Sequence, residues 1–102
     1  MKKLLLLLLA ITLSTVSYSQ LTNDNFQEAI NTCLLNNPVD GLCSTSEFGA
    51  MPDWDVSQVT DMSSSFESKA DFNGDISKWD TSSVTNMQSM FNAASKFNQL
   101  LK

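Results

Sequence analysis

The chain is 102 residues long and carries 11 acidic residues against six lysines, with no arginine or histidine, for a formal net charge of −5. Binding to nucleic-acid phosphates or to an anionic membrane surface depends on clustered basic residues, so this composition argues against both partners. Without histidine a serine nucleophile lacks its usual base, and the glycines form no phosphate-binding loop, so the sequence predicts no enzyme and no cofactor.

The first 19 residues have the pattern of a secretory signal peptide. Two lysines at 2–3 precede an apolar run at 4–13, and residues 17–19 give a small-x-small cleavage pattern. The run is too short to cross a hydrocarbon core about 30 Å thick, and the first cysteine, Cys33, lies far from any lipid-modification position. We therefore expect a secreted or cell-surface protein, with no membrane insertion after signal cleavage.

Residues 20–50 are predicted to form an N-terminal cap that contains a helix at about 24–35. Apolar residues recur there at helical spacing: Phe26, Ala29, Ile30, Cys33 and Leu34. Three residues are candidate N-caps: Thr22, Asn23 and Asp24. Asp24 followed by Gln27 fits a capping box. A repeat array needs such a cap, because its first unit would otherwise expose its interior to water.

Cys33 and Cys43 are the only two cysteines, and we predict a disulfide between them. Closing so short a loop would stabilise the fold by roughly 2–3 kcal/mol. The alternatives are a reactive thiol pair and a metal pair, and neither has a histidine or a further cysteine to support it.

Residues 54–78 and 79–102 are two copies of one sequence, 25 positions apart. Ten positions are identical: Trp54/Trp79, Asp55/Asp80, Ser57/Ser82, Val59/Val84, Thr60/Thr85, Met62/Met87, Ser64/Ser89, Phe66/Phe91, Phe72/Phe97 and Asn73/Asn98. Met51 and Ile76 also correspond, so the repeats are placed at 51–102, the first at 51–78 and an incomplete second at 79–102. A period in the twenties is typical of solenoids, whose units bury their apolar faces against each other.

Each copy is predicted to hold one short strand and one short helix. The Trp-Asp segments at 54–56 and 79–81 alternate as strands do. Helical spacing recurs in both copies, at Val59, Met62 and Phe66 and at Val84, Met87 and Phe91. The predicted fold class is α/β, a short solenoid of strand–helix repeats behind a helical cap. Its predicted interior consists of Trp54, Val59, Met62, Phe66, Phe72, Ile76, Trp79, Val84, Met87, Phe91 and Phe97.

The strings MPDWDVSQVTDMSSSF and FNGDISKWDTSSVTNMQSMFNAASKFNQ resemble repeats of the BspA-like family of leucine-rich-repeat-related bacterial surface proteins. The resemblance covers residues 48–102 and implies a leucine-rich-repeat-like fold. It also implies a protein that binds host, matrix or neighbouring-cell components. Ser65 and Thr81 replace a methionine and a valine of the family pattern, and after Gln99 the pattern is abandoned. We expect a fragment of a longer array, with a short functional protein as the alternative.

Asp55 and Asp80 are the candidate ligand-binding residues. In adjacent parallel strands their carboxylates would lie about 4.8 Å apart on an exposed face, and like charges in register repel. A cation or a cationic ligand would relieve this repulsion. Alternatively, each carboxylate accepts backbone N–H groups of the next turn, a purely structural role.

Other motifs favour structural roles. Residues 71–75 begin like a calcium loop but lack the glycine and the acid that an EF-hand requires, so we predict no metal site. Trp54 and Trp79 could be sugar-stacking platforms, but a tryptophan repeated in each copy is more simply part of the core. Asn73 and Asn98 are expected to bond the backbone at a turn.

The sequence is consistent with two functions. The first is a secreted binding or adhesion module for an unidentified protein, cell-surface or matrix ligand. The second is a structural component of the surface or envelope that binds nothing specific.

Overall fold

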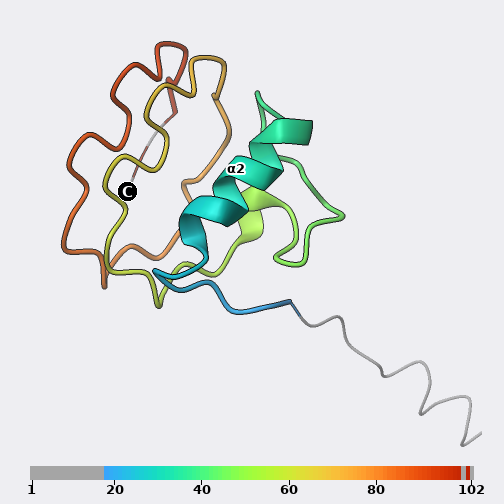
Figure 1. Cartoon of the computed structure of the whole chain (residues 1–102), viewed down its shortest axis with the longest axis vertical. Helices are drawn as coiled ribbons and strands as arrows, with labels where there is room; N and C mark the ends of the chain where they lie inside the picture. Colours follow the sequence, from blue (N-terminus) through green and yellow to red (C-terminus); the bar gives the residue numbers. More distant parts are fainter. Residues whose placement is uncertain (1–17, 100, 102) are drawn as a thin grey trace, which may run out of the picture.

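The computed structural model describes residues 18–99 and 101 (Figure 1). Within them the regular elements are helix α2, Phe26–Asn36, and a 3-10 helix η1, Met51–Asp53. The rest of this part of the chain is turns and extended segments, with one isolated parallel β-bridge between Asp61 and Asn86. No helix within these limits is long and apolar enough to span a membrane. The predicted signal peptide lies outside the described residues except for positions 18 and 19.

Helix α2 buries one face against the repeats. Its buried residues are Phe26, Ala29, Ile30, Cys33 and Leu34. The side chain of Asn25 fixes the chain before the helix, because its Oδ1 accepts the N–H of Thr22 at 2.8 Å. The predicted capping box with Asp24 is wrong: no side-chain cap bond forms, and Gln27 Nε2 donates instead to the carbonyl of Ser65 at 3.0 Å.

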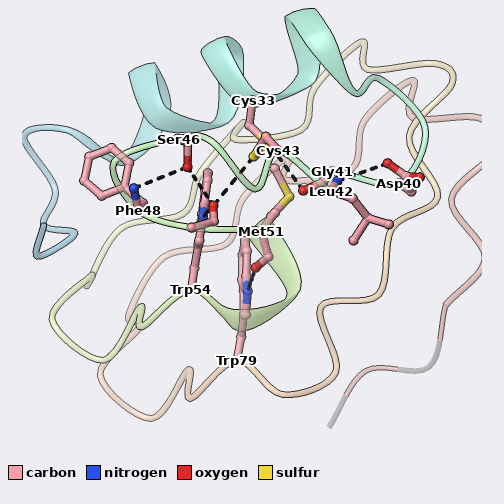
Figure 2. Close-up of a disulfide and its surroundings, with 11 residues drawn as sticks. Cys33, Asp40, Gly41, Leu42, Cys43, Ser46, Phe48, Met51, Trp54 and Trp79 are labelled. Atoms are coloured by element: carbon pink, nitrogen blue, oxygen red, sulfur yellow. Dashed lines mark hydrogen bonds between the residues drawn. A yellow bond between two sulfur atoms is a disulfide. The ribbon is translucent and has the colours of Figure 1, made fainter. Parts of the chain in front are cut away.

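The predicted disulfide between Cys33 and Cys43 is confirmed, with the two Cα atoms 5.3 Å apart. It joins the end of α2 to the following loop, and Figure 2 places it between the helix and the side chains of Met51 and Trp54. Gly41 allows the loop to pass this point, because its φ of 67° is left-handed and its carbonyl accepts the N–H of Met51 at 3.0 Å.

The predicted strand–helix solenoid is wrong, since the described chain after Asn36 contains neither a strand nor an α-helix. At the expected strands, residues 54–56 and 79–81, the backbone enters a turn instead of continuing as a strand. Asp55 Oδ1 accepts the N–H of Ser57 at 3.0 Å, and Asp80 Oδ1 accepts the N–H of Ser82 at 3.0 Å. These Asx turns compete with an extended ladder, so no sheet develops.

The helices expected in the two copies are absent, because each copy contains residues whose backbone φ angle is in the left-handed region. Ser64 and Ser68 have φ values of 57° and 62°, and Ser89 and Ala93 in the second copy both have 59°. A right-handed helix cannot continue through such residues. Successive turns replace it, closed by bonds such as Glu67 N–H to the Ser64 carbonyl at 3.1 Å.

The two copies nevertheless lie against each other, as neighbouring loops of similar path in Figure 1. Alternate N–H groups of the first copy donate to carbonyls of the second at 2.8–2.9 Å: Met62 to Asn86, Ser64 to Gln88, Phe66 to Met90 and Ser68 to Asn92. The intervening N–H groups bond within the first copy, so every backbone N–H from Met62 to Lys69 has an acceptor. This pairing satisfies the backbone without a sheet.

Equivalent aromatic rings stack between the copies. The centroid distances are 6.2 Å for Trp54–Trp79, 5.5 Å for Phe66–Phe91 and 5.6 Å for Phe72–Phe97, with interplanar angles of 8°, 7° and 11°. Of the predicted interior, seven residues are buried: Trp54, Val59, Met62, Phe66, Phe72, Ile76 and Trp79. Val84, Phe91 and Phe97 are half-buried. The prediction for Met87 is wrong, since its side chain is 46% exposed, whereas its repeat-mate Met62 is fully buried.

Candidate binding surface

Asp55 and Asp80 occupy equivalent exposed turns of the two copies. Each uses its Oδ1 atom to accept the N–H of the serine two residues on, and Asp55 also accepts the Ser57 hydroxyl at 2.6 Å. The structure thus contains the Asx turns that were the alternative reading of these two residues. The hydrogen bonds fix each carboxylate and leave it open to solvent.

Both carboxylates are held in the ionised form. Bonds from the Ser57 hydroxyl and then from its backbone N–H lower the pKa of Asp55 below its ordinary value of 3.8, against small opposing effects of burial and of the charge on Asp80. The Ser82 hydroxyl and N–H lower the pKa of Asp80 in the same way. The pair therefore carries two negative charges at neutral pH, near enough for one to affect the titration of the other.

The same turn recurs elsewhere in the chain. Its other instances are Asp40 with Leu42, Asp61 with Ser63, Asp75 with Ser77 and Asn86 with Gln88. Four aspartates of the repeats are thus held in one local geometry, and Asn86 shows that an amide can replace the carboxylate. The turn needs an oxygen acceptor, whereas the charge is an additional property.

Asn73 and Asp71, which lie in the segment that begins like a calcium loop, both contact their partners in the second copy. Asn73 Oδ1 accepts the N–H of Asn98 at 2.8 Å, which joins equivalent turns of the two copies. Asp71 lies 3.4 Å from Lys96 Nζ, its repeat-mate, and is thereby paired with a cation of the chain itself. Among residues 18–99 and 101, no three or more acids or cysteines are grouped as a metal site would require.

The tryptophans present no platform for a sugar. Trp54 and Trp79 are 3% and 6% exposed, and their indole N–H groups donate to the carbonyls of Gly49 at 2.7 Å and Met51 at 2.9 Å. With faces stacked and N–H groups bonded, both rings belong to the core.

The sequence reasoning missed how the cap holds the first copy. Asn23 Oδ1 accepts the N–H groups of Thr60 at 2.9 Å and Asp61 at 3.3 Å, and its Nδ2 donates to the Thr60 hydroxyl at 2.8 Å. In the second copy Thr85 instead donates to the Thr60 carbonyl at 2.7 Å. Thr60 has a repeat-mate only on its C-terminal side, Thr85, and this was the available signal that the cap must supply the other partner, but nothing in the sequence names that partner.

A family model described as "Mycoplasma protein of unknown function, DUF285" matches residues 35–102, which include both copies and the loop that precedes them. No curated protein and no solved structure matches the chain.

Proposed function

The chain belongs to the DUF285 family, and we propose that it is a secreted or cell-surface binding module whose Asp55–Asp80 pair receives a basic protein ligand. The leader-like residues 1–19 support export. The resemblance of residues 48–102 to BspA-like surface proteins supports the binding role. No enzymatic step is part of this proposal.

The observation that carries the proposal is that two exposed carboxylates, at equivalent positions of the two copies, are each fixed by an Asx turn. Asp55 accepts the N–H and the hydroxyl of Ser57 through Oδ1, and Asp80 accepts the N–H of Ser82 through Oδ1, so both exposed carboxylates have room for a further donor. Because the Asx turns already hold the side chains, a ligand would lose little side-chain entropy on binding them. Arginine, with its forked donors, is suited to such carboxylates.

The test is the double substitution Asp55→Asn with Asp80→Asn. Asparagine keeps the acceptor that closes each turn and removes the charge, as Asn86 does naturally. We expect the affinity for a synthetic arginine-rich peptide, measured by calorimetry, to fall at least about tenfold, the loss of roughly one charge-assisted bond. Unfolding should stay cooperative, with at most a small loss of stability at pH 7, because the depressed pKa values mean that the two charges contribute some stability themselves.

Asp40→Asn is the matched control, because Asp40 closes an identical turn with Leu42 in the cap. It removes the same formal charge from a different part of the molecule and should leave peptide binding unchanged. Equal weakening in both proteins would indicate a general effect of net charge and would contradict a site at Asp55 and Asp80.

The second candidate is a structural surface component. It is favoured by the way charges are paired within the repeats, with Asp53 and Lys78 3.2 Å apart and Asp71 and Lys96 3.4 Å apart, each pair joining equivalent positions of the two copies. An arginine-rich peptide that binds neither the wild type nor the variants would support this role.

A further inference from the structure

A polar cavity of about 170 Å³ lies between the cap and the first copy. Its lining residues come from both parts: Asn23, Phe26 and Gln27 from the cap, and Asp61, Ser63 and Ser65 from the first copy. All of them except Phe26 are polar. Asp61 is exposed and Ser63 is half-buried, whereas Ser65 and Phe26 are buried. The cavity therefore runs from a polar mouth inward to Ser65 and Phe26.

The side chain of Ser65 has an unusual position in this cavity. The residue is 1% exposed, and its Oγ atom has no hydrogen-bond partner among the described residues. Its backbone is satisfied, since its N–H donates to the Met62 carbonyl and its carbonyl accepts Gln27 Nε2. A buried hydroxyl without a partner is unfavourable, so such a group calls for a bound molecule or an ordered water.

The second copy has no equivalent of this polar lining. The three lining positions of the first copy all differ from their repeat-mates, which are Asn86, Gln88 and Met90, whereas the intervening positions 62, 64 and 66 are identical in both copies. Met90 is 6% exposed, so a repeat of this type can bury a methionine where the first copy has Ser65. The shorter serine side chain leaves to the cavity space that a methionine would fill. The lining is thus a particular property of the first copy.

The cavity offers hydrogen-bond acceptors and a negative charge. Gln27 Nε2 donates to Asn31 Oδ1 at 3.1 Å and to the Ser65 carbonyl at 3.0 Å, so both of its hydrogens are used and Oε1 is the atom that can accept. Bonds from the Ser63 hydroxyl and N–H lower the pKa of Asp61, which is therefore ionised at neutral pH. None of the six lining residues is basic.

We propose that this cavity binds a primary ammonium group, whose three N–H donors are matched by the Asp61 carboxylate, the Gln27 side-chain carbonyl and the Ser65 hydroxyl. The Phe26 ring at the inner end supplies apolar surface for the carbon that carries the ammonium. A calcium ion is a poorer match, because it takes six to eight oxygen ligands and the lining contains one carboxylate.

A primary ammonium group can come from the lysine side chain of another protein or from a small free amine. The chemistry of recognition is the same for both. The cavity is separate from the Asp55–Asp80 pair, and the inference does not depend on the proposed function.

The experiment is an NMR titration of the ¹⁵N-labelled protein at constant ionic strength. The probes are methylammonium and the lysine derivative N-acetyl-lysine amide. Both the backbone amide signals of residues 63–66 and the side-chain amide signal of Gln27 should shift and saturate. We expect a dissociation constant of about 1 mM for the better probe, as one charge-assisted bond and two neutral bonds would give. Tetramethylammonium carries the same charge without N–H donors and should give no saturable shift.

Three variants test the residues of the cavity. Asp61→Asn keeps the acceptor that closes its turn, as Asn86 does, and should weaken binding about tenfold or more through loss of the charge. Ser65→Ala should weaken binding about fivefold, and Ser65→Met, which fills the cavity, should abolish it. Asp40→Asn removes a charge from an identical turn with Leu42 outside the cavity and should bind as the wild type does. Unfolding curves show whether each variant remains folded.

The outcomes separate the source of the amine from the existence of the site. Saturation by the lysine derivative would assign the site to a polypeptide lysine, and saturation by methylammonium alone would assign it to a free amine. The inference would be overturned by the absence of a saturable shift with either probe, which would leave Ser65 to an ordered water. It would also be overturned by equal shifts with tetramethylammonium, by saturation with calcium alone, or by unchanged binding in the folded Ser65 variants.

Discussion

The indole rings of Trp54 and Trp79 lie 6.2 Å apart and within 8° of parallel, although the backbones of their Trp-Asp segments exchange no hydrogen bond. The backbone N–H of Trp79 bonds to Ile76, and its indole N–H reaches the Met51 carbonyl at 2.9 Å. At this corner of the repeat, ring contact and an indole bond hold the copies together, whereas a backbone ladder does so at residues 62–68.

Replacement of Trp79 by alanine should therefore destabilise the protein strongly. It removes a buried ring that contacts Trp54 and Phe26 and takes one of two donors from the Met51 carbonyl, which keeps the N–H of Trp54. We expect a loss of about 3–5 kcal/mol in the free energy of unfolding, measured with urea. Leu35→Ala, at an exposed site, should cost little, and an equal loss in both would show that the stack contributes nothing specific.

Removal of the disulfide should weaken the cap. The double variant Cys33→Ser with Cys43→Ser should lose about 2–3 kcal/mol, because the unfolded chain gains freedom over the loop. Thermal unfolding with and without reductant checks this. Reductant should lower the midpoint of the wild type to near that of the variant and leave the variant unchanged; a wild type insensitive to reductant would contradict the prediction.

Gly74→Ala should be destabilising for steric reasons. A Cβ at this position would lie 2.6 Å from Phe72 Cε1 and 2.7 Å from the Asp40 carbonyl oxygen, and the latter belongs to the backbone. We expect a loss of about 1–3 kcal/mol in urea unfolding, as for other overpacked sites. Ser83→Ala, at an exposed position, is the control. A stable Gly74→Ala protein would mean that the loop at Asp40 can move away at little cost.

The acid dependence of stability should change in Asp61→Asn. Bonds from Ser63, its hydroxyl first and its N–H second, lower the pKa of Asp61 below 3.8 in the folded protein. A depressed pKa contributes stability that is present above the unfolded value and disappears as the pH falls through the folded value. Asparagine keeps the turn, as at Asn86, without titrating.

The measurement is the free energy of unfolding of the wild type and Asp61→Asn from pH 7 to pH 2. Relative to the variant, the wild type should lose stability only below about pH 4, near the ordinary carboxyl pKa. A difference that is constant across the whole range would show that the Asp61 charge has no differential interaction in the folded state.

The period of 25 predicted which residues of the two copies would meet, and it did so because repeats bury equivalent surfaces against each other. It did not predict the conformation. The spacing of Val59, Met62 and Phe66 fits a helix, and the positive φ values at Ser64 and Ser68 are incompatible with one. A left-handed residue other than glycine costs about 1–2 kcal/mol locally, and in the first copy the bonds to the second copy help to offset that cost.

The candidate site was predicted in identity and only partly in geometry. Asp55 and Asp80 were identified from their equivalent positions in the two copies. Whether each segment forms a strand or a turn depends on the bond from the N–H of the serine two residues on to the aspartate. The sequence is compatible with both conformations. Met87 was assigned to the interior because its repeat-mate Met62 fits there. Periodicity treats both copies as equivalent and carries no information on how far each one is covered by its neighbours.

The alternate N–H groups of residues 62–68 all point toward the second copy, and those of 87–93 point onward in the same sense. The backbone N–H groups of Thr85, Lys96 and Asn98 donate the other way, to the first copy. Peptide dipoles so aligned add rather than cancel, unlike the alternating dipoles of a sheet. We therefore expect a locally positive potential at the N–H groups of Met87–Ala93, in a protein with an excess of acidic residues.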